Sequence, residues 1–194
     1  MAEHVCPVWV GYLLASPLRK LTQHPEKILE PYVSAGMTVL DVGCAMGFFS
    51  LPLARFVGPG GRVICVDMQE EMFRSLRRRA RKAGFDDRIQ TRVCRRDSLC
   101  VDDLAEQIDF ALAFAVVHEV PDGPGLFVQL HRVLKPSGKL LMAEPKGRVS
   151  RQAFEASTSV AEQSGFEVVE RLKISRSHAI LLKKQEAMGE NNDI

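Results

Sequence analysis

The stretch VLDVGCAMGFFSLPLA, residues 39–54, decides the fold, because an apolar run ends in an acid and then turns directly into a second apolar segment. Residues 37–42 have the composition of a buried strand, whereas 46–57 repeat apolar residues at helical spacing. Gly43 and Gly47 lie in the turn between them. When a strand leads directly into a helix, the free N–H groups of the helix N-terminus face the end of the strand. We therefore expect a ligand-binding turn at the carboxyl edge of a sheet.

Strand and helix patterns alternate along the rest of the chain. The 108–116 run is almost wholly apolar, which is typical of a strand in the centre of a sheet. We expect strands at 37–42, 61–67, 88–94, 108–116 and 139–144, helices at 46–57, 72–84, 125–134 and 151–164, and a last antiparallel pair at 166–174 and 178–184. This order predicts an α/β fold with a single Rossmann-like, doubly wound, mostly parallel seven-stranded sheet, helices on both faces and a final antiparallel strand.

The length and composition suit one globular domain, with 194 residues of which 46% are hydrophobic and 26% charged. We expect a core over 37–184, an N-terminal lid or helical segment over 1–36 and a flexible polar tail over 185–194. Five cysteines without a CxxC pair indicate reduced thiols and a cytoplasmic location. No run approaches the ~20 apolar residues of a membrane span, so no membrane partner is expected.

The acid at the end of the first strand indicates which ligand the turn would accept. A dinucleotide-binding turn carries glycines in the pattern G-x-G-x-x-G, which lets a pyrophosphate pass close to the backbone. Gly43 and Gly47 lack that spacing, and Asp41 suits a cationic ligand better than a diphosphate. The pattern therefore disfavours a nicotinamide-dependent dehydrogenase.

Four motifs in order resemble those of the class I S-adenosylmethionine-dependent methyltransferases, over about residues 37–145. DVGCAMG resembles the first motif, D/E-x-G-x-G-x-G, ICVD the acid that ends the second strand, CRRDS the third motif, and LHRVLKPSGKLLMAEP the block around the fifth strand. HEVPD is most similar to the small-molecule branch that includes quinone-type and arsenite methyltransferases. The resemblance implies S-adenosyl-L-methionine as cofactor and a small-molecule substrate.

The resemblance also implies which residues hold that cofactor. The first motif would face the amino and carboxylate groups of the methionine part, and the acid after the second strand would accept hydrogen bonds from both ribose hydroxyls. The residue after that acid would pack on the adenine, the third motif would accept from the adenine amino group, and the end of the fourth strand would flank the sulfonium. The implied residues are Asp41, Gly43, Ala45, Gly47, Asp67, Met68, Asp97, Ser98 and Ala115.

Three of these positions have an alternative interpretation or depart from the motif. Asp67 could instead cap the helix after it, and Asp97 could cap a short helix over 99–104. Ala45 replaces the middle glycine of the motif, and its Cβ is tolerated if its φ stays negative, although it narrows the approach to the ligand. Ala45 therefore bears on the affinity for the cofactor and not on its identity.

Methyl transfer from a sulfonium is an in-line displacement, to which a protein contributes positioning, exclusion of water and, for weak nucleophiles, a base. The candidates for the base lie just after the fourth and fifth strands. His118 is the best single candidate because its ordinary pKa lies near neutrality, although it could instead bond the backbone and shape its loop. Glu144 could act directly, or it could pair with Lys146 or Arg148.

The residues at the end of the fourth strand disfavour some substrate and metal classes. AVVHEV lacks the [D/N]PP[Y/F] stretch of methyltransferases that act on adenine or cytosine. Phe114 and Ala115 stand where metal-dependent catechol methyltransferases have an acid, so no metal is expected. Cys44, Cys65 and Cys94 could meet near the sheet edge, where we favour buried thiols over a metal or arsenic site.

Two segments have open interpretations. Arg74–Arg96 holds nine Arg, one Lys and two Asp, a local net charge of +8 in a chain of net charge +2. We favour a solvated helix face there, although clustered arginines would also suit a nucleic acid or a phosphorylated partner. Trp9, Tyr12, Leu13 and Leu14 could form a lid over the substrate, or they could simply pack on the core.

Two functions of different classes fit these observations. The first is an active methyltransferase that acts on a small molecule. The second is an S-adenosylmethionine-binding protein without catalysis that acts as a partner or regulatory subunit, which Ala45 and the lack of one decisive base would suit.

Overall fold

The computed structural model describes residues 23–185. Strands and helices alternate along the chain, as the sequence pattern predicts. The elements are α2 (Pro25–Leu29), β1 (Thr38–Val42), α3 (Ser50–Val57), β2 (Arg62–Asp67), α4 (Glu70–Ala83), β3 (Ile89–Val93), the 3₁₀ turn η2 (Asp102–Leu104), β4 (Ile108–Phe114), the 3₁₀ turn η3 (Val117–Glu119), α5 (Gly123–Val133), β5 (Leu134–Pro145), α6 (Arg151–Gln163), β6 (Phe166–Arg171) and β7 (Ser177–Lys184).

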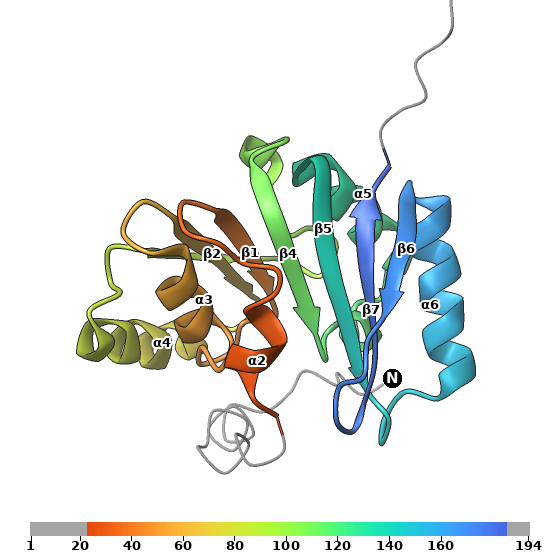
Figure 1. The fold of residues 1–194 in the computed structure, drawn as a ribbon, viewed down its shortest axis with the longest axis horizontal. Helices are drawn as coiled ribbons and strands as arrows, with labels where there is room; N and C mark the ends of the chain where they lie inside the picture. The colour runs from red at the N-terminus through yellow and green to blue at the C-terminus, as the bar shows by residue number, and fades with distance from the viewer. Residues whose placement is uncertain (1–22, 186–194) are drawn as a thin grey trace, which may run out of the picture.

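The strands form one seven-stranded sheet in the order β3-β2-β1-β4-β5-β7-β6 (Figure 1). β1 pairs in parallel with β2 and β4, β2 pairs in parallel with β3, and β4 with β5. β7 runs antiparallel to both of its neighbours, β5 and β6. The predicted mostly parallel sheet with a final antiparallel strand is therefore confirmed. The strand order reverses at β1, and ligands of open parallel sheets bind at such a reversal, beyond the carboxyl ends of the strands.

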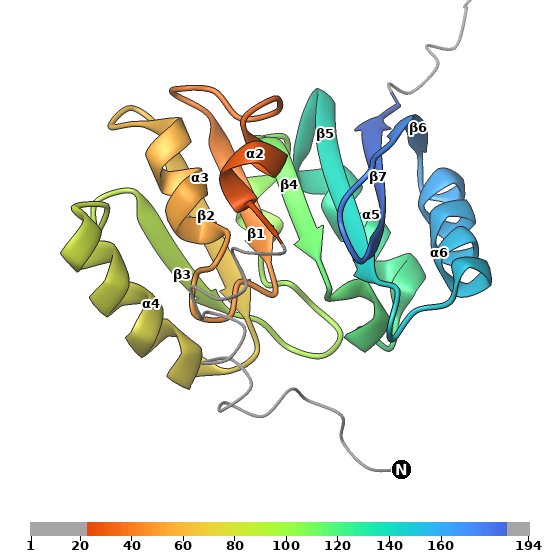
Figure 2. The ribbon, with the colours of Figure 1, turned by 60° about the horizontal axis from the view of Figure 1, so that its bottom comes forward.

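Helices cover both faces of the sheet, as Figure 1 and Figure 2 show from two sides. Residues of α2, α3 and α4 belong to one apolar cluster, together with Val39 and Phe110 of the sheet. Residues of α5 and α6 belong to a second cluster, together with Leu40 and Ala111. Successive strand residues thus point to opposite faces, and both faces of the central strands are buried. This explains why the β4 sequence is an almost unbroken apolar run.

Element bounds differ from the expectation where the backbone makes a turn. The helix predicted from residue 46 begins at Ser50, because residues 46–49 continue the turn after β1. β4 ends at Phe114, because Ala115 has a φ of +59°, which no extended strand accommodates. β5 begins at Leu134, earlier than the sequence pattern suggests, and β6 ends earlier, at Arg171.

Capping side chains fix the starts of two helices, α5, which begins at Gly123 and not at the expected residue 125, and α6, which begins at Arg151 as expected. The Asp122 carboxylate accepts a hydrogen bond from the Gly125 amide at 2.9 Å, and the Ser150 hydroxyl accepts one from the Ala153 amide at 3.1 Å. Each satisfies an N–H group that has no partner within its own helix. The first of these caps fixes the start of α5 beside the ends of β4 and β5.

The part of the predicted N-terminal segment that the structure describes lies against the core. Leu29 and Val33 are buried, and the ring of Tyr32 stacks on that of Phe110 with their centroids 6.1 Å apart. The aromatic and leucine residues proposed as a lid, between residues 9 and 14, lie outside the described residues, as does nearly all of the predicted tail. Within residues 23–185, no helix is both long and apolar enough to span a lipid bilayer.

Candidate functional site

A cavity lies at the carboxyl edge of the sheet, where β1, β2 and β4 end. Its wall combines the turn after β1, the connection from β3 to η2, the turn after β4 and the first half of α5. The residues that line it are 41–46, 48–49, 67–69, Met72, 94–99, 114–116, 119–122, Leu126 and Gln129. Every residue predicted to bind the cofactor lies on this wall except Gly47.

Each of the two glycines of the turn is required by a different close contact. Gly43 has a φ of +70°, and a Cβ there would lie 2.7 Å from Cγ2 of Val116. Gly47 has a φ of +83°, and a Cβ there would lie 2.3 Å from Cδ1 of Leu76 in α4. Gly43 therefore lets β1 and the turn after β4 approach each other at the cavity, whereas Gly47 lets α4 pack against the turn.

Ala45 does not have the negative φ that we expected of it. Its φ is +45°, so an L-residue occupies the left-handed region, at a cost of about 1–2 kcal/mol. Its amide donates to Oδ2 of Asp67 at 2.9 Å, which holds this conformation. Nη1 of Arg79 in α4 also donates to the carbonyl of Met46, the next residue. The turn is thus strained and fixed from outside, as is common where backbone is shaped for a ligand.

Asp41 places a buried carboxyl group at the cavity wall. Its exposed fraction is 3%, and the hydroxyl of Ser50 donates to its Oδ2 at 2.6 Å. Burial raises the pKa of Asp41 to about 7, an effect that the Ser50 hydrogen bond reduces and the charge of Asp67 increases. A buried carboxylate without a cationic partner is costly, so a positively charged ligand in the cavity would stabilise its ionised form.

Asp67 ends β2 and does not cap α4. The N-cap residue of α4 is Gln69, which makes no side-chain cap, so the capping alternative is wrong. Oδ1 of Asp67 accepts from the Gln69 amide at 3.0 Å, while Oδ2 accepts from Ala45. Burial raises the pKa of Asp67, and its bonds to the amides of Gln69, Ala45 and Met68 counteract this. The carboxylate keeps acceptor capacity at the wall, which suits a pair of neighbouring hydroxyls.

The wall beyond Asp67 is formed by Met68 and by the connection after β3. Met68 is 41% exposed, which is unusual for a methionine and leaves its side chain available to a flat ligand group. The alternative that Asp97 caps a helix over 99–104 is wrong, since η2 begins at Asp102 without a side-chain cap. Gln129 of α5 instead holds this connection, because its Oε1 accepts from the Leu99 amide at 2.8 Å.

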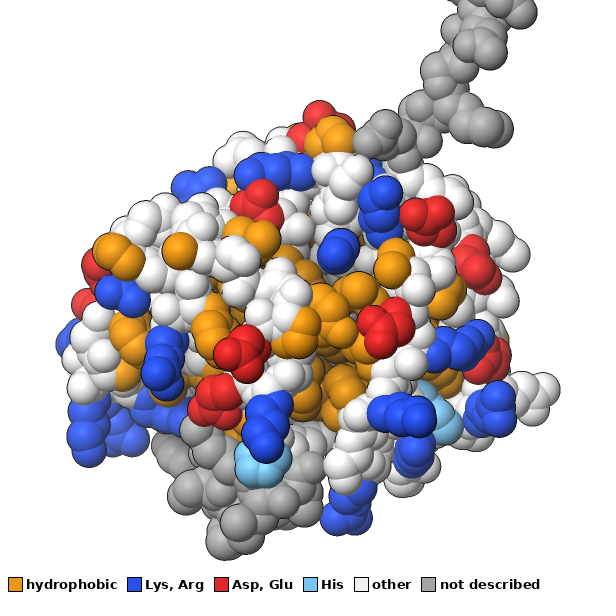
Figure 3. All heavy atoms as spheres, viewed as in Figure 1, with side chains coloured by type: hydrophobic (Ala, Val, Ile, Leu, Met, Phe, Trp, Pro, Cys, Tyr) orange, Lys and Arg blue, Asp and Glu red, His pale blue; other side chains and the backbone are white. Residues whose placement is uncertain are grey.

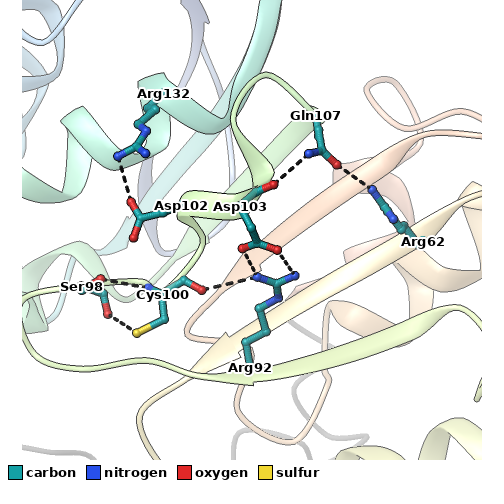
Figure 4. A network of polar contacts seen from close by, with 8 residues as sticks. All are labelled: Arg62, Arg92, Ser98, Cys100, Asp102, Asp103, Gln107 and Arg132. Carbon is teal, nitrogen blue, oxygen red and sulfur yellow. Dashed lines mark hydrogen bonds and ion pairs between the residues drawn. The ribbon is translucent and has the colours of Figure 1, made fainter.

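A network of polar contacts braces the connection from β3 to β4 (Figure 4). Arg92 of β3 donates to both carboxylate oxygens of Asp103, and Arg132 of α5 donates to Asp102 at 2.9 Å. The hydroxyl of Ser98 accepts from the Cys100 amide at 3.1 Å. These ion pairs are largely exposed and therefore add little stability, so their combined effect is to orient the loop that carries Asp97 and Ser98.

One side of the cavity is apolar. The rings of Phe49 and Phe114 have centroids 4.4 Å apart, and those of Phe48 and Phe49 are 5.1 Å apart at nearly a right angle. Ala115, with its positive φ, turns the chain away after β4, and its amide donates to the carbonyl of Ala143 at 2.7 Å. This side of the cavity would exclude water from a ligand placed between the two walls.

His118 and Glu144, the predicted catalytic residues, bond to each other. Glu144 is 1% exposed; its Oε1 accepts from the amides of Val116 and Val117 at 3.2 and 2.8 Å, and its Oε2 bonds to Nδ1 of His118. The alternative that Glu144 pairs with Lys146 or Arg148 is wrong, because the amides of Val116 and Val117 and the ring of His118 take its oxygens. Neither His118 nor Glu144 lies on the wall of the cavity, and their direct roles in catalysis stay predictions.

Sequence reasoning missed several residues of the wall and its support. Glu119 lines the cavity although the sequence favours the adjacent His118, and no local pattern singles out Gln129 or Ser50. The sequence pattern also places Phe48 and Phe49 in a helix that begins only after them. A signal for Glu119 exists, since it is a second ionisable residue in the same turn after the fourth strand.

The four cysteines of the described part of the chain form no metal-binding group. Cys44, Cys65, Cys94 and Cys100 are free, and the first two are buried. Burial raises the pKa of the Cys94 thiol to about 11. Across residues 23–185, no three His, Cys, Asp or Glu side chains are placed to hold a metal ion together.

Comparisons with known proteins identify the family of this chain. The family model described as a methyltransferase domain matches residues 33–190. An arsenite methyltransferase of Halobacterium salinarum is 32% identical over 112 residues, which cover 58% of this chain and 28% of that protein. A demethylmenaquinone methyltransferase of Symbiobacterium thermophilum is 30% identical over 128 residues, which cover 66% of this chain and 50% of that protein. The matched stretch thus spans half or less of the length of these relatives.

A similar solved structure extends the likeness to the fold. The crystal structure of a SAM-dependent methyltransferase from Aquifex aeolicus superposes with a TM-score of 0.80 at 23% identity, covering 92% of this chain and 98% of that one. The four motifs that predicted the family lie within the stretch that the family model matches. The chain therefore belongs to the methyltransferase-domain family of class I S-adenosylmethionine-dependent methyltransferases.

Proposed function

We propose that this chain transfers a methyl group from S-adenosylmethionine to a small organic acceptor bound against the phenylalanine wall. The observation that carries the proposal is the buried carboxyl group of Asp41 at the cavity wall, beside a backbone turn kept open by Gly43. A ligand with a cationic amino group would neutralise this carboxylate, so the residues fit the cofactor that the family implies.

The residues on the side of the cavity that contains Asp41 and Asp67 would hold the cofactor. Asp41 and the turn over 43–46 would take its methionine part, Asp67 would accept from its ribose hydroxyls, and Met68 with the connection over 97–98 would enclose its adenine. When bound, S-adenosylmethionine supplies an electrophilic methyl group. Ala115 and Val116 would orient the sulfonium, and the two walls would keep water away from it.

The acceptor would lie toward the apolar wall. Phe48, Phe49 and Phe114 supply apolar surface, and Glu119 is an ionisable group that also lines the cavity. His118 and Glu144 would fix the turn over 115–119, which sets the position of the acceptor relative to the methyl group. The small-molecule substrates of the relatives, arsenite and demethylmenaquinone by their names, support a small acceptor.

A nucleic-acid substrate is less well supported. Lys and Arg side chains gather at the lower left of Figure 3, where α4 lies in Figure 1. Arg74, Arg78 and Lys82 of α4 are exposed, which suits the solvated face that we favoured.

The free thiols of the described residues support the proposed cytoplasmic location.

Titration calorimetry followed by an acceptor panel tests the proposed function. We expect heat on adding S-adenosylmethionine and none on adding NAD. With phenols, thiols, amines and arsenite supplied in turn, S-adenosylhomocysteine should form with at least one class, measured by mass spectrometry. Binding of NAD without binding of S-adenosylmethionine would contradict the cofactor. Binding of S-adenosylmethionine without turnover on any class would favour the non-catalytic alternative.

A further inference from the structure

Glu119 and His118 are neighbours in the 3₁₀ turn after β4, and their side chains have different surroundings. Glu119 lines the cavity, with 30% of its side chain exposed. His118 bonds through Nδ1 to the buried Glu144, and its Nε2 lies 3.8 Å from Oε1 of Glu119. A 3₁₀ turn has three residues per turn, so adjacent side chains point about 120° apart. Glu119 thus faces the cavity, whereas His118 does not line it.

The hydrogen bonds of Glu144 fix which nitrogen of His118 carries a proton. A carboxylate only accepts hydrogen bonds, so Nδ1 of His118 must be the donor. Oε1 of Glu144 is bonded to the amides of Val116 and Val117, so the carboxylate cannot turn away. The imidazole is therefore held with Nε2 directed toward Glu119, as second-layer carboxylates hold histidines elsewhere.

Charged groups from three other segments act on Glu119. His118 is on its own turn, Arg148 lies after β5 with Nη1 3.8 Å from Oε1 of Glu119, and the carboxylates of Glu144 and Asp67 end β5 and β2. Burial raises the pKa of Glu119; the charges of His118 and Arg148 lower it, and those of Glu144 and Asp67 raise it further. The net effect is a carboxylate that is more basic than usual and still faces two cations.

His118 is poorly suited to accept a proton itself. Its hydrogen bond with Glu144 raises the pKa of His118, an effect that burial only partly offsets. His118 also does not line the cavity, and both of its ring nitrogens face carboxylates of the protein, Nδ1 that of Glu144 and Nε2 that of Glu119. It can instead stabilise the carboxylate beside it.

We propose that Glu119 accepts the proton of the methyl acceptor, with His118 and Glu144 as its positioning residues. This inference rests on the proposed function and names the acceptor as a molecule whose nucleophilic atom must lose a proton, such as a hydroxyl group. The O–H bond of the acceptor breaks and its proton moves to Glu119. The electron pair of that oxygen forms the new bond to the methyl carbon, while the pair of the broken carbon–sulfur bond stays on sulfur.

The first test compares Glu119→Gln with Glu167→Gln, a control on β6 whose carboxylate pairs with Lys183 at 3.9 Å away from the cavity. The probes are phenol, which is protonated at neutral pH, and a dinitrophenol, which is already ionised. With phenol, kcat of Glu119→Gln should fall by about 10²–10⁴-fold. With the ionised probe, the loss should be small, and calorimetry should show S-adenosylmethionine affinity within about twofold of the wild type.

The outcomes separate this inference from the proposed function. Equal kcat losses for both phenols, or wild-type kcat in Glu119→Gln, would overturn the role of Glu119 while leaving methyl transfer intact. Turnover confined to thiols or arsenite would also overturn it, because those nucleophiles need no such base. A protein that binds S-adenosylmethionine and methylates nothing would remove the proposed function, and this inference with it.

The second test uses the pH dependence of kcat at saturating substrates, which reports ionisations in the bound complex. We expect kcat to fall toward acid pH as Glu119 becomes protonated. His118→Gln and Arg148→Gln each remove a positive charge facing Glu119, so the acid limb should move to higher pH in both. ¹³C NMR of the Glu119 carboxyl should show the same direction of change in its pKa. Lower kcat with an unmoved limb and an unmoved NMR titration would show that His118 acts only on the shape of the turn.

Discussion

Two pairs of carboxylates at the cavity have different charged neighbours: Asp41 and Asp67, which both line it, and Glu119, which lines it, with Glu144 outside its wall. On the cofactor side, Asp41 is bonded to a neutral hydroxyl and Asp67 to backbone amides, and the charge of Asp67 raises the pKa of Asp41 further. On the acceptor side, Glu144 is bonded to His118, and Glu119 lies 3.8 Å from both His118 and Arg148. The negative charges of Asp41 and Asp67 are therefore not balanced by a bonded cation, whereas those of Glu119 and Glu144 are nearly balanced by His118 and Arg148.

This difference indicates where a cationic ligand belongs. A buried carboxylate without a cation has a raised pKa and gains most from a positive ligand, as Asp41 does. A carboxylate that already faces cations, as Glu119 does, gains less from one more positive charge. Charge balance therefore separates the side of the cavity with Asp41 and Asp67, which we assign to the cofactor, from the side with Glu119, which we assign to the acceptor. This distinction does not depend on any bound molecule.

Glu144→Ala should cause the largest loss of stability, and it acts on the side of the cavity that contains Glu119. It leaves the amides of Val116 and Val117 and the ring of His118 without their acceptor in a buried site, which should cost about 3–5 kcal/mol of unfolding free energy. Glu144→Gln keeps one oxygen for the amides and should cost about 1–2 kcal/mol. Urea unfolding measures both variants.

Two further measurements make this result specific. The share of stability due to His118 is complete below its unfolded pKa of about 6.5 and is lost as the pH rises through its raised folded pKa, so the Glu144→Gln deficit should shrink above neutrality. Calorimetry should show unchanged S-adenosylmethionine affinity in the folded variant. A large loss of that affinity would contradict the assignment of Glu144 to the acceptor side and not to the cofactor side.

Asp41→Asn should stabilise the free protein while weakening its binding of S-adenosylmethionine. The folded pKa of Asp41 is about 7 and its unfolded pKa is about 3.9, so between these values the native state holds more protons and stability falls as the pH rises. Asparagine still accepts from Ser50 but carries no charge. Above pH 7 we expect it to raise the free energy of unfolding by about 1–3 kcal/mol.

The control for Asp41→Asn is Asp87→Asn, at an exposed carboxylate. Urea unfolding at pH 5 and pH 8 should show a pH-dependent gain for Asp41→Asn and almost no change for the control. S-adenosylmethionine affinity should fall about 10- to 100-fold in Asp41→Asn, and in the wild type it should decline as the pH drops below 7. A variant that is less stable at pH 8 would show that the Asp41 charge is compensated in the free protein.

Asp67→Asn tests the ribose contact on the same wall. The amide oxygen of asparagine can replace only one of the two acceptors that bond Ala45 and Gln69, and its NH₂ group cannot accept from a hydroxyl. We expect S-adenosylmethionine to bind about 5- to 150-fold more weakly, equivalent to about 1–3 kcal/mol, while the domain stays folded. Calorimetry and a thermal melt measure the two effects. Unchanged affinity with a much lower melting temperature would make Asp67 a structural residue.

The sequence predicts the sheet and the cofactor wall because both depend on local patterns. Apolar runs of known period specify the strands, and Asp41 and Asp67 end two of those runs, where parallel strands bring their carboxyl ends together. The acceptor wall depends on side-chain direction instead. His118 and Glu119 are adjacent in sequence, and only the hydrogen bonds of Glu144 decide which of them faces the cavity.

Contacts between distant residues explain the other differences. Gln129 reaches the amide of Leu99 from α5, a pairing that neither local sequence indicates. A negative φ is the local expectation for Ala45 because it carries a Cβ. The bond from its amide to Asp67 is made between residues 22 positions apart, and it holds the strained conformation against that local preference.

Ala45→Gly should have the smallest effect and tests whether the cofactor wall stores strain. Glycine removes a left-handed penalty of about 1–2 kcal/mol but makes the unfolded chain more flexible, at a cost of about 0.4–1 kcal/mol. The net expectation is a gain of about 0–1 kcal/mol in the free energy of unfolding. The matched control is Ala153→Gly in the exposed first turn of α6, where glycine should lose about 0.5–1 kcal/mol. Opposite signs for the two alanines in urea unfolding would confirm that the turn is strained, whereas equal losses would show that Asp67 and Arg79 hold Ala45 without penalty.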